Sequence, residues 1–381
     1  MLETNTKMAK HLPHPSRRPL PVLPDELISE ILLRVPVRSL VQFRCVCKSW
    51  NSQFSNPQFA KDHLRTSTTT TTTHPNQRLV SSIIGDPKII SFSVQSLFQN
   101  PSTPARARRF RMSDKYHILG SCNGLLCLCD IHQRCIRLWN PSIRFRSQRF
   151  PTGVTLDAGI THHGFGYDHV SDTYKLLVAV EDLHEKVTKV YTFGENSWRV
   201  IPNFPCRPTR WLGKFVSGTL NWIAKGGASD DQWVILNFDL GSETYGEVLL
   251  PKGGDSDKIC NPVLNVLRGC LCVCFYDSKE ARWVVWLMTE YGVQHSWTKL
   301  VMIPHFIQDP WIEFQHSMFR WYHSLEPLDI SENGVVILKT NFSKVVIYNS
   351  NDGRLDYPRI TGERGLHDLH SYHESLVSLP C

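Results

Sequence analysis

The chain has 381 residues, of which 41% are hydrophobic and 20% are charged. These are ordinary values for a globular protein that can bury a sizeable core. No apolar run approaches the roughly 18–20 residues that a membrane helix needs, and the polar first 21 residues lack the hydrophobic stretch of a secretion signal. We therefore expect a cytoplasmic or nuclear protein without membrane contact, in which the twelve cysteines stay reduced.

The net charge of +7 is unevenly distributed, because residues 101–149 carry +8 whereas residues 150–381 carry −7. The densest basic run comprises Arg106, Arg108, Arg109 and Arg111. This run lacks the interleaved aromatic side chains on which single-stranded nucleic acid stacks. We interpret it as a solvated loop and expect no nucleic-acid partner.

Residues 22–64 have the pattern of short helices. Asp25 and Glu26 provide the acidic first turn that favours a helix start, and Pro36 ends that helix. Apolar residues recur at helical spacing in three segments, with a further turn or two before residue 64. We predict a three-helix domain over residues 22–64, preceded by a disordered segment, residues 1–21.

A nearly pure threonine tract follows the helices, from Thr66 to Thr73. It has no apolar residues whose burial could offset the entropy of ordering the chain. We predict a flexible threonine-rich linker over residues 65–77.

Residues 78–375 change to the period-two pattern of β-strands, with regular glycine and proline punctuation. A glycine followed by an apolar strand recurs at intervals of roughly 40–65 residues, a spacing typical of propeller blades. The clearest copies begin at Gly124, Gly218, Gly269 and Gly334, and a looser copy begins at Gly166, between the first two. Each is followed by an aromatic-rich strand, a short turn and a further strand that ends before a proline, as in Tyr191 to Pro202.

One such sheet of about four strands cannot bury both of its faces alone, whereas radially packed sheets bury one another. We therefore predict a mainly β protein, in which the helical domain is followed by a β-propeller-like repeat domain of six to eight blades. The alternative is a stack of β-sandwiches.

The order of motifs in the helical segment resembles an F-box, from Leu23-Pro24-Asp25-Glu26-Leu27 through Leu40 to Phe43-Arg44-Cys45 and Trp50. The rest resembles the F-box-associated (kelch-like) β-propeller region of the large plant F-box family. The landmarks that carry this second resemblance are Asn140-Pro141-Ser142, Gly164-Phe165-Gly166-Tyr167-Asp168 and Tyr174-Lys175.

The resemblance implies the substrate-recognition subunit of an SCF-type E3 ubiquitin ligase. The F-box would dock on a Skp-type adaptor, and through it on a cullin ligase, while the propeller would hold a target protein. The alternative is an adaptor-bound interaction scaffold that does not lead to degradation. Either role places catalysis in other subunits, so we expect no enzyme activity here.

The three short helices carry more apolar surface than they can hide from water, and the surplus is expected to form a partner site. With the family resemblance, we predict that this site comprises Leu23, Pro24, Ile28, Leu32, Val35, Val37 and Leu40. Phe43 and Trp50 are assigned to the domain's own core. The alternative is that all of these residues pack inward or against the propeller.

Propellers usually bind partners through the loops at one end. Five residues in the predicted loops have the aromatic and arginine character of binding hot spots, namely Arg207, Arg210, Trp211, Trp311 and Phe314. We predict that they contact the target protein, although plain surface variation would explain them as well.

Two cysteine clusters and a histidine pair invite a catalytic or metal-binding interpretation. The spacing Cys-x-Cys inside apolar strands differs from the paired spacing of zinc sites, so we interpret the cysteines as small buried hydrophobes at blade interfaces. His162 and His163 are assigned to a strand-edge loop. We predict no catalytic residue, metal or cofactor.

Overall fold

A computed structural model describes most of the chain. The described residues are 23–69, 76–83, 85–130, 132–152, 160–181, 186–226, 232–252, 259–277, 279–304, 324–340, 344–360 and 366–379. The predicted disordered segment, residues 1–21, lies outside them.

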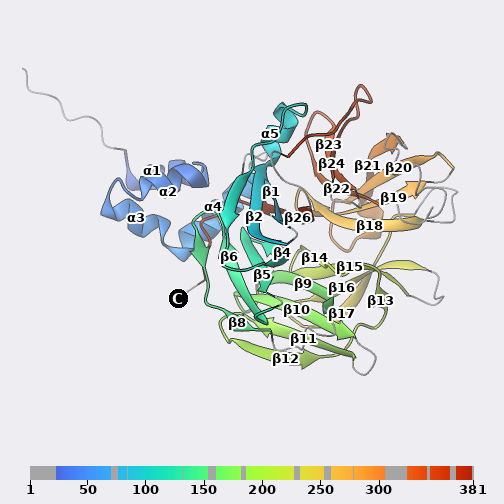
Figure 1. The fold of residues 1–381 in the computed structure, drawn as a ribbon, viewed down its shortest axis with the longest axis horizontal. Helices are drawn as coiled ribbons and strands as arrows, with labels where there is room; N and C mark the ends of the chain where they lie inside the picture. Colours follow the sequence, from blue (N-terminus) through green and yellow to red (C-terminus); the bar gives the residue numbers. More distant parts are fainter. Residues whose placement is uncertain are drawn as a thin grey trace, which may run out of the picture.

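Four helices form the N-terminal helical domain, residues 23–69 (Figure 1). They are α1 (Asp25–Leu32), α2 (Val37–Phe43), α3 (Lys48–Phe54) and α4 (Pro57–Thr69). Pro24 and Pro36 occupy the N-cap positions of α1 and α2 with extended backbones, which agrees with the tendency of proline to mark helix starts. The prediction of three helices and a final turn underestimated α4, which is the longest of the four.

The start of the predicted linker differs from the prediction, because α4 continues to Thr69. The hydroxyls of Thr68 and Thr69 donate to the carbonyl oxygens of Leu64 and Arg65, at 3.0 and 2.9 Å. These bonds fix the threonine rotamers on the helix, a local effect that composition alone does not reveal. The first strand then begins at Gln77, and residues 70–75 lie outside the description.

The described strands form six antiparallel sheets, which are the blades of a β-propeller. Blade 1 contains β26 (Leu366–His373), β1 (Gln77–Ile83), β2 (Asp86–Ser93) and β3 (Arg108–Arg111). Blade 2 contains β4 (His117–Cys122), β5 (Leu125–Asp130), β6 (Cys135–Asn140), β7 (Phe145–Arg146) and β8 (Phe150–Pro151). Blade 3 contains β9 (Ile160–Asp168), β10 (Thr173–Glu181), β11 (Lys186–Thr192) and β12 (Ser197–Ile201).

The second half of the ring follows the same plan. Blade 4 contains β13 (Arg207–Pro208), β14 (Lys214–Val216), β15 (Thr219–Lys225), β16 (Trp233–Asp239) and β17 (Tyr245–Leu249). Blade 5 contains β18 (Cys260–Leu267), β19 (Cys270–Asp277), β20 (Arg282–Met288) and β21 (Trp297–Pro304). Blade 6 contains β22 (Leu325–Ile330), β23 (Val335–Thr340), β24 (Val345–Asn349) and β25 (Leu355–Asp356). Two short helices lie between strands of the propeller. They are α5 (Val94–Gln99) and a 3₁₀ helix (Gln294–Ser296).

The two ends of the β domain meet in blade 1, where the C-terminal strand β26 pairs with β1 in antiparallel register, from Gln77 opposite His373 to Ile83 opposite Leu366. This pairing closes the ring and makes β26 the innermost strand of blade 1. Six blades agree with the predicted range of six to eight, and the stack of sandwiches is excluded.

The inner strands crowd together near the axis, and this explains part of the Gly-Phe-Gly landmark. A Cβ atom at Gly166 would clash with the Phe215 ring of blade 4, and one at Gly164 would lie 3.0 Å from Leu220. Glycine is therefore needed at these two positions for close approach of neighbouring blades rather than for a phosphate loop.

The basic run predicted to be a loop is instead an edge strand. Arg108 to Arg111 form β3, the outermost strand of blade 1, which pairs with β2. Arg108 also pairs with Glu374 at 2.9 Å. A charged edge strand protects a sheet against edge-to-edge association, which is a physical reason for the charge that does not involve nucleic acid.

The helical domain and the propeller share one continuous apolar core. That core joins Leu32, Val37 and Leu40 of the helices to residues of blades 2 and 3 and to Leu376 and Val377 of the C-terminal tail (residues 374–379). Figure 1 shows the chain end beside α4, at the junction of the two domains. The helical domain is therefore packed against one end of the propeller and is not attached to it through a flexible linker alone.

Candidate interaction surfaces

The structure divides the predicted adaptor contacts into two groups. Leu23 and Pro24 are exposed and Ile28 and Val35 are half-buried, so these four can reach a partner. Leu32, Val37 and Leu40 are instead buried in the shared core. Their prediction as contact residues is corrected, because their side chains already hold the helices to one another and to the propeller.

Exposed apolar side chains lie elsewhere on the same helices. Leu27 and Ile31 are 51% and 53% exposed, and Leu23 just before α1 is 53% exposed. Because residues four apart lie on one helix face, Leu27 and Ile31 form an apolar stripe along α1, which we call the α1 stripe. Val46, between α2 and α3, is 64% exposed. Three of these residues, Leu27, Ile31 and Val46, were not predicted as contacts, although the four-residue spacing of the first two was visible in the sequence.

Phe43 and Trp50 are half-buried and pack against other aromatic side chains of the helical domain, which agrees with their assignment to its core. Their ring centroids are 5.6 Å apart, and a chain of aromatic contacts continues from Trp50 to Phe54 and Phe59. Below them, the buried His63 ring contacts the Val35 carbonyl oxygen through Nε2 at 2.8 Å. Burial lowers the pKa of His63, so the imidazole is neutral at pH 7 and adds no charge to this core.

An exposed ion pair links α4 to the propeller. Lys61 of α4 lies 2.5 Å from Asp172, in the turn between β9 and β10 of blade 3, and its ammonium group lies 6.0 Å from the centre of the Tyr167 ring. In the tail, the Ser375 hydroxyl donates to the Asn123 carbonyl oxygen at 2.8 Å and the Asn140 amide donates to the Val377 carbonyl oxygen at 2.8 Å. The Asn140 landmark thus anchors the tail.

The candidate target-binding residues lie at the other end of the propeller. The inner strands of blades 3 and 4 run parallel, with His163 bridged to Leu212. Since β9 runs towards the helical domain, Arg207 at the start of β13 lies at the end away from it. Arg207, Arg210 and Trp211 are exposed there, and Trp211 is 60% exposed. Trp311 and Phe314 lie outside the described residues.

The cysteine clusters are packing residues, as predicted. Cys127 and Cys129 face the core shared with the helices, and Cys272 and Cys274 face the interface of blades 5 and 6. Burial raises the pKa of Cys129 to about 12, so the thiol is protonated and unreactive at neutral pH. Within the described residues no cluster of histidine, cysteine or acidic side chains could hold a metal ion.

The two histidines lie within β9 and not in a strand-edge loop; His162 is buried and His163 is partly buried. The backbone of His163 pairs with Trp211 and Gly213 of the neighbouring blade, and the His162 ring contacts the Pro208 carbonyl oxygen at 3.2 Å. Burial lowers the pKa of His163 to about 3. Both imidazoles are therefore neutral side chains of the blade interface.

The landmark Lys175 is the centre of a buried network between blades 3 and 4. Its ammonium lies 2.9 Å from Asp168 and 3.0 Å from Glu243, and it donates to the Leu240 carbonyl oxygen at 2.7 Å. Burial disfavours the charged lysine, but the hydrogen bonds to Asp168 and Glu243 outweigh burial and raise the Lys175 pKa. Burial likewise disfavours the ionised form of Asp168, but its hydrogen-bonding and ionic partners outweigh burial. The pKa of Asp168 is therefore lowered.

Comparison with known proteins matches both parts of this architecture. The model of the F-box domain matches residues 20–62, and that of the F-box associated beta propeller domain matches residues 80–379. The chain belongs to the F-box-associated β-propeller family.

Curated relatives of this F-box protein match over nearly the whole chain. An F-box/kelch-repeat protein from Arabidopsis thaliana is 31% identical over 373 residues, which cover 93% of this chain and 95% of the relative. F-box protein CPR1 from the same plant is 25% identical, with 89% and 84% covered. Among solved structures, a chain of a nidogen/laminin complex aligns with a TM-score of 0.44 at 10% identity, over 78% of this chain and 99% of that chain.

Among the described helices of the F-box protein, none is long and apolar enough to cross a membrane.

Proposed function

We propose that this F-box protein is the substrate-recognition subunit of an SCF-type E3 ubiquitin ligase. In this role the F-box docks on a Skp-type adaptor, and the end of the propeller that carries Arg207, Arg210 and Trp211 binds a target protein. The proposed role needs no catalytic centre in this chain. The exposed α1 stripe carries the docking part of the proposal, because a folded helix that presents Leu27 and Ile31 to water gains free energy when a partner covers them.

The test is a binding assay between the purified full chain and a purified Skp-type adaptor. The parent is expected to form a stable complex, and the Leu27→Asp/Ile31→Asp variant is expected to lose at least about 100-fold in affinity, because two carboxylates would be desolvated in an apolar interface. Both positions are half exposed in the free chain, so the variant should keep its parent unfolding temperature. Leu32 and Leu40 are unsuitable for this test, since their replacement would break the core.

A matched control comes from the propeller. Val200 on β12 is 64% exposed, and Val200→Asp should bind the adaptor as the parent does. Full binding by the α1 stripe variant would contradict the docking model. Target turnover in cells separates the ligase from the non-degradative scaffold, because only a ligase subunit should lose turnover when the α1 stripe is charged.

A further inference from the structure

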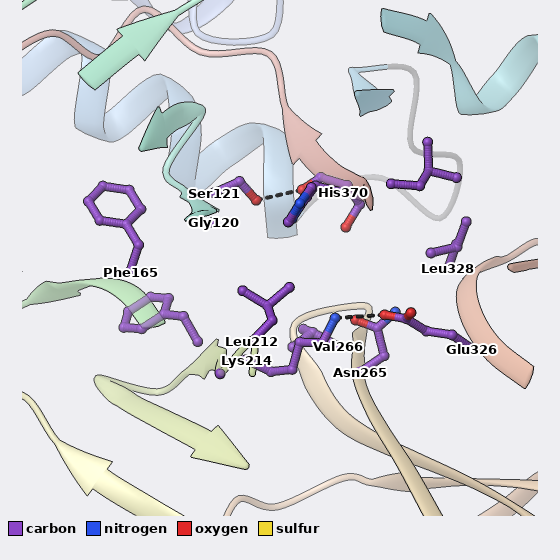
Figure 2. A pocket seen from close by; sticks show the side chains of 14 residues that line it. Gly120, Ser121, Phe165, Leu212, Lys214, Asn265, Val266, Glu326, Leu328 and His370 are labelled. Atoms are coloured by element: carbon purple, nitrogen blue, oxygen red, sulfur yellow. Dashed lines mark hydrogen bonds and ion pairs between the residues drawn. The ribbon is translucent and has the colours of Figure 1, made fainter. Parts of the chain in front are cut away.

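A partly open cavity lies on the propeller axis. It has a volume of about 150 Å³ and is lined by the inner strands of all six blades (Figure 2). Each blade contributes one polar or aromatic residue to the lining. In blade order these are His370, Ser121, Phe165, Lys214, Asn265 and Glu326. A cavity of this size admits a molecule of about six non-hydrogen atoms.

A three-residue ionic cluster at the cavity carries a surplus of positive charge; Lys214 and Glu326 line the cavity, whereas Lys339 pairs with Glu326 from outside the lining. Lys214 Nζ lies 2.7 Å from one Glu326 carboxylate oxygen, and Lys339 Nζ lies 3.2 Å from the other. The three side chains are only 15 to 17% exposed. Burial disfavours ionisation of Glu326, but the two lysines outweigh it and hold its pKa well below the usual range. Two ammonium groups therefore share one carboxylate, which leaves a net charge of +1.

A second observation points into the same space. The His370 side chain is buried, with 7% exposure, and its Nε2 atom has no hydrogen-bond partner among the described residues. Burial and the two lysines lower the pKa of His370, so the neutral ring does not add to or cancel the surplus charge. Figure 2 shows His370 beside Ser121, across the cavity from the Lys214–Glu326 pair. A buried ring nitrogen without a partner is destabilising, so a ligand that pairs with it gains affinity.

The rest of the lining combines polar groups with apolar side chains. The polar residues include Ser121, Asn265 and Ser371, and the apolar ones include Leu212, Leu328, Leu369 and Phe165. A bare inorganic anion would leave this surface uncovered, whereas a charged head with a short hydrocarbon chain matches both parts of the cavity.

From these observations we propose that the axial cavity binds a free small monocarboxylate of about six non-hydrogen atoms. Its carboxylate accepts hydrogen bonds from Lys214 and the His370 Nε2–H, and its hydrocarbon chain contacts the leucines and Phe165. Such a ligand would neutralise the surplus charge on the axis and bridge opposite blades. The binding is independent of the adaptor, so this proposal stands or fails separately from the proposed function.

The test uses butyrate, which has six non-hydrogen atoms, and its uncharged counterpart butyramide. Saturation-transfer NMR and thermal unfolding of the full chain are recorded at constant ionic strength with each probe. Butyrate is expected to bind with a Kd on the order of 1 mM and to raise the unfolding temperature. Butyramide and inorganic phosphate should do neither. Equal binding of butyrate and butyramide, or no binding of butyrate, would overturn the proposal.

Variants locate the binding. Lys214→Met should weaken butyrate at least about tenfold, because Glu326 and Lys339 then cancel in charge, and His370→Phe should weaken it less. Lys115→Met removes an exposed lysine outside the cavity and should change nothing. Should Lys214→Met fail to fold, Lys214→Arg keeps the ion pair with a bulkier head and must still reduce butyrate binding. A capped Ala-Glu-Ala peptide that displaces butyrate would assign the cavity to a protein carboxylate and overturn the proposal of a free acid.

Discussion

At the scale of single residues, the most unusual group is Asp329 on β22. It is 1% exposed, and one carboxylate oxygen accepts a 2.8 Å hydrogen bond from the Ile330 amide while the other has no partner in the described part of the chain. Burial raises its pKa from 3.8 to about 7, and the Ile330 amide and Arg268 only partly oppose this. The folded chain therefore holds this carboxyl protonated over a pH range in which the unfolded chain releases the proton.

This raised pKa predicts a pH-dependent stability. The contribution of Asp329 is fully present below about pH 4 and is lost as the pH rises through 7, because the unfolded state then binds fewer protons. The loss should be on the order of 2–4 kcal/mol by pH 8. Asp329→Asn cannot ionise, so its stability relative to the parent should rise from pH 4 to pH 8 in urea unfolding. A difference that stays constant with pH would contradict the raised pKa.

At the scale of elements, much was predictable from sequence alone, because local patterns encode it. Pro36 separates α1 from α2, and the repeated glycine-led strands predict the blades. Which part of the apolar face of α1 is exposed was not predictable, since Leu27, Ile28, Ile31 and Leu32 lie in two adjacent rows of one broad apolar face. Tertiary contacts with later helices contribute to that choice, such as the 3.0 Å hydrogen bond from the Gln53 amide of α3 to the Ser29 hydroxyl of α1. The threonine extension of α4 was missed because its hydroxyl–carbonyl bonds depend on the local backbone, which composition does not reveal.

The blade 3–blade 4 junction supports a prediction about which ion pairs matter. In Lys175→Met, the carboxylates of Asp168 and Glu243 stay buried without their shared cation, which should cost about 3–5 kcal/mol in the free energy of unfolding. Lys61→Met removes an ion pair whose side chains are 45% and 62% exposed, and it should cost less than about 1 kcal/mol. Urea titrations of both variants measure the two losses. Equal losses would show that burial does not set the strength of these pairs.

At the scale of the whole molecule, the ring closure and the domain junction depend on one segment. Strand β26 completes blade 1, and the tail that follows it immediately enters the core shared with the helices. The α1 stripe and Trp211 therefore stay at a fixed separation on opposite sides of the propeller. In the proposed role, a rigid link of this kind would hold a target at a constant position relative to the adaptor for as long as the tail stays packed.

The tail gives a whole-molecule test of that rigidity. The parent should unfold in one thermal transition, because Leu376 and Val377 place both domains in one core. In Leu376→Asp/Val377→Asp, charges at two buried positions should expel the tail, so the helical domain should melt separately and at least about 10 °C earlier. Leu249→Asp, at a position 44% exposed, should keep the single transition. Calorimetry and far-ultraviolet circular dichroism follow the two domains, since helices dominate one and strands the other. A single, unshifted transition in the tail variant would mean that the Lys61–Asp172 pair and the direct helix contacts hold the domains together without the tail.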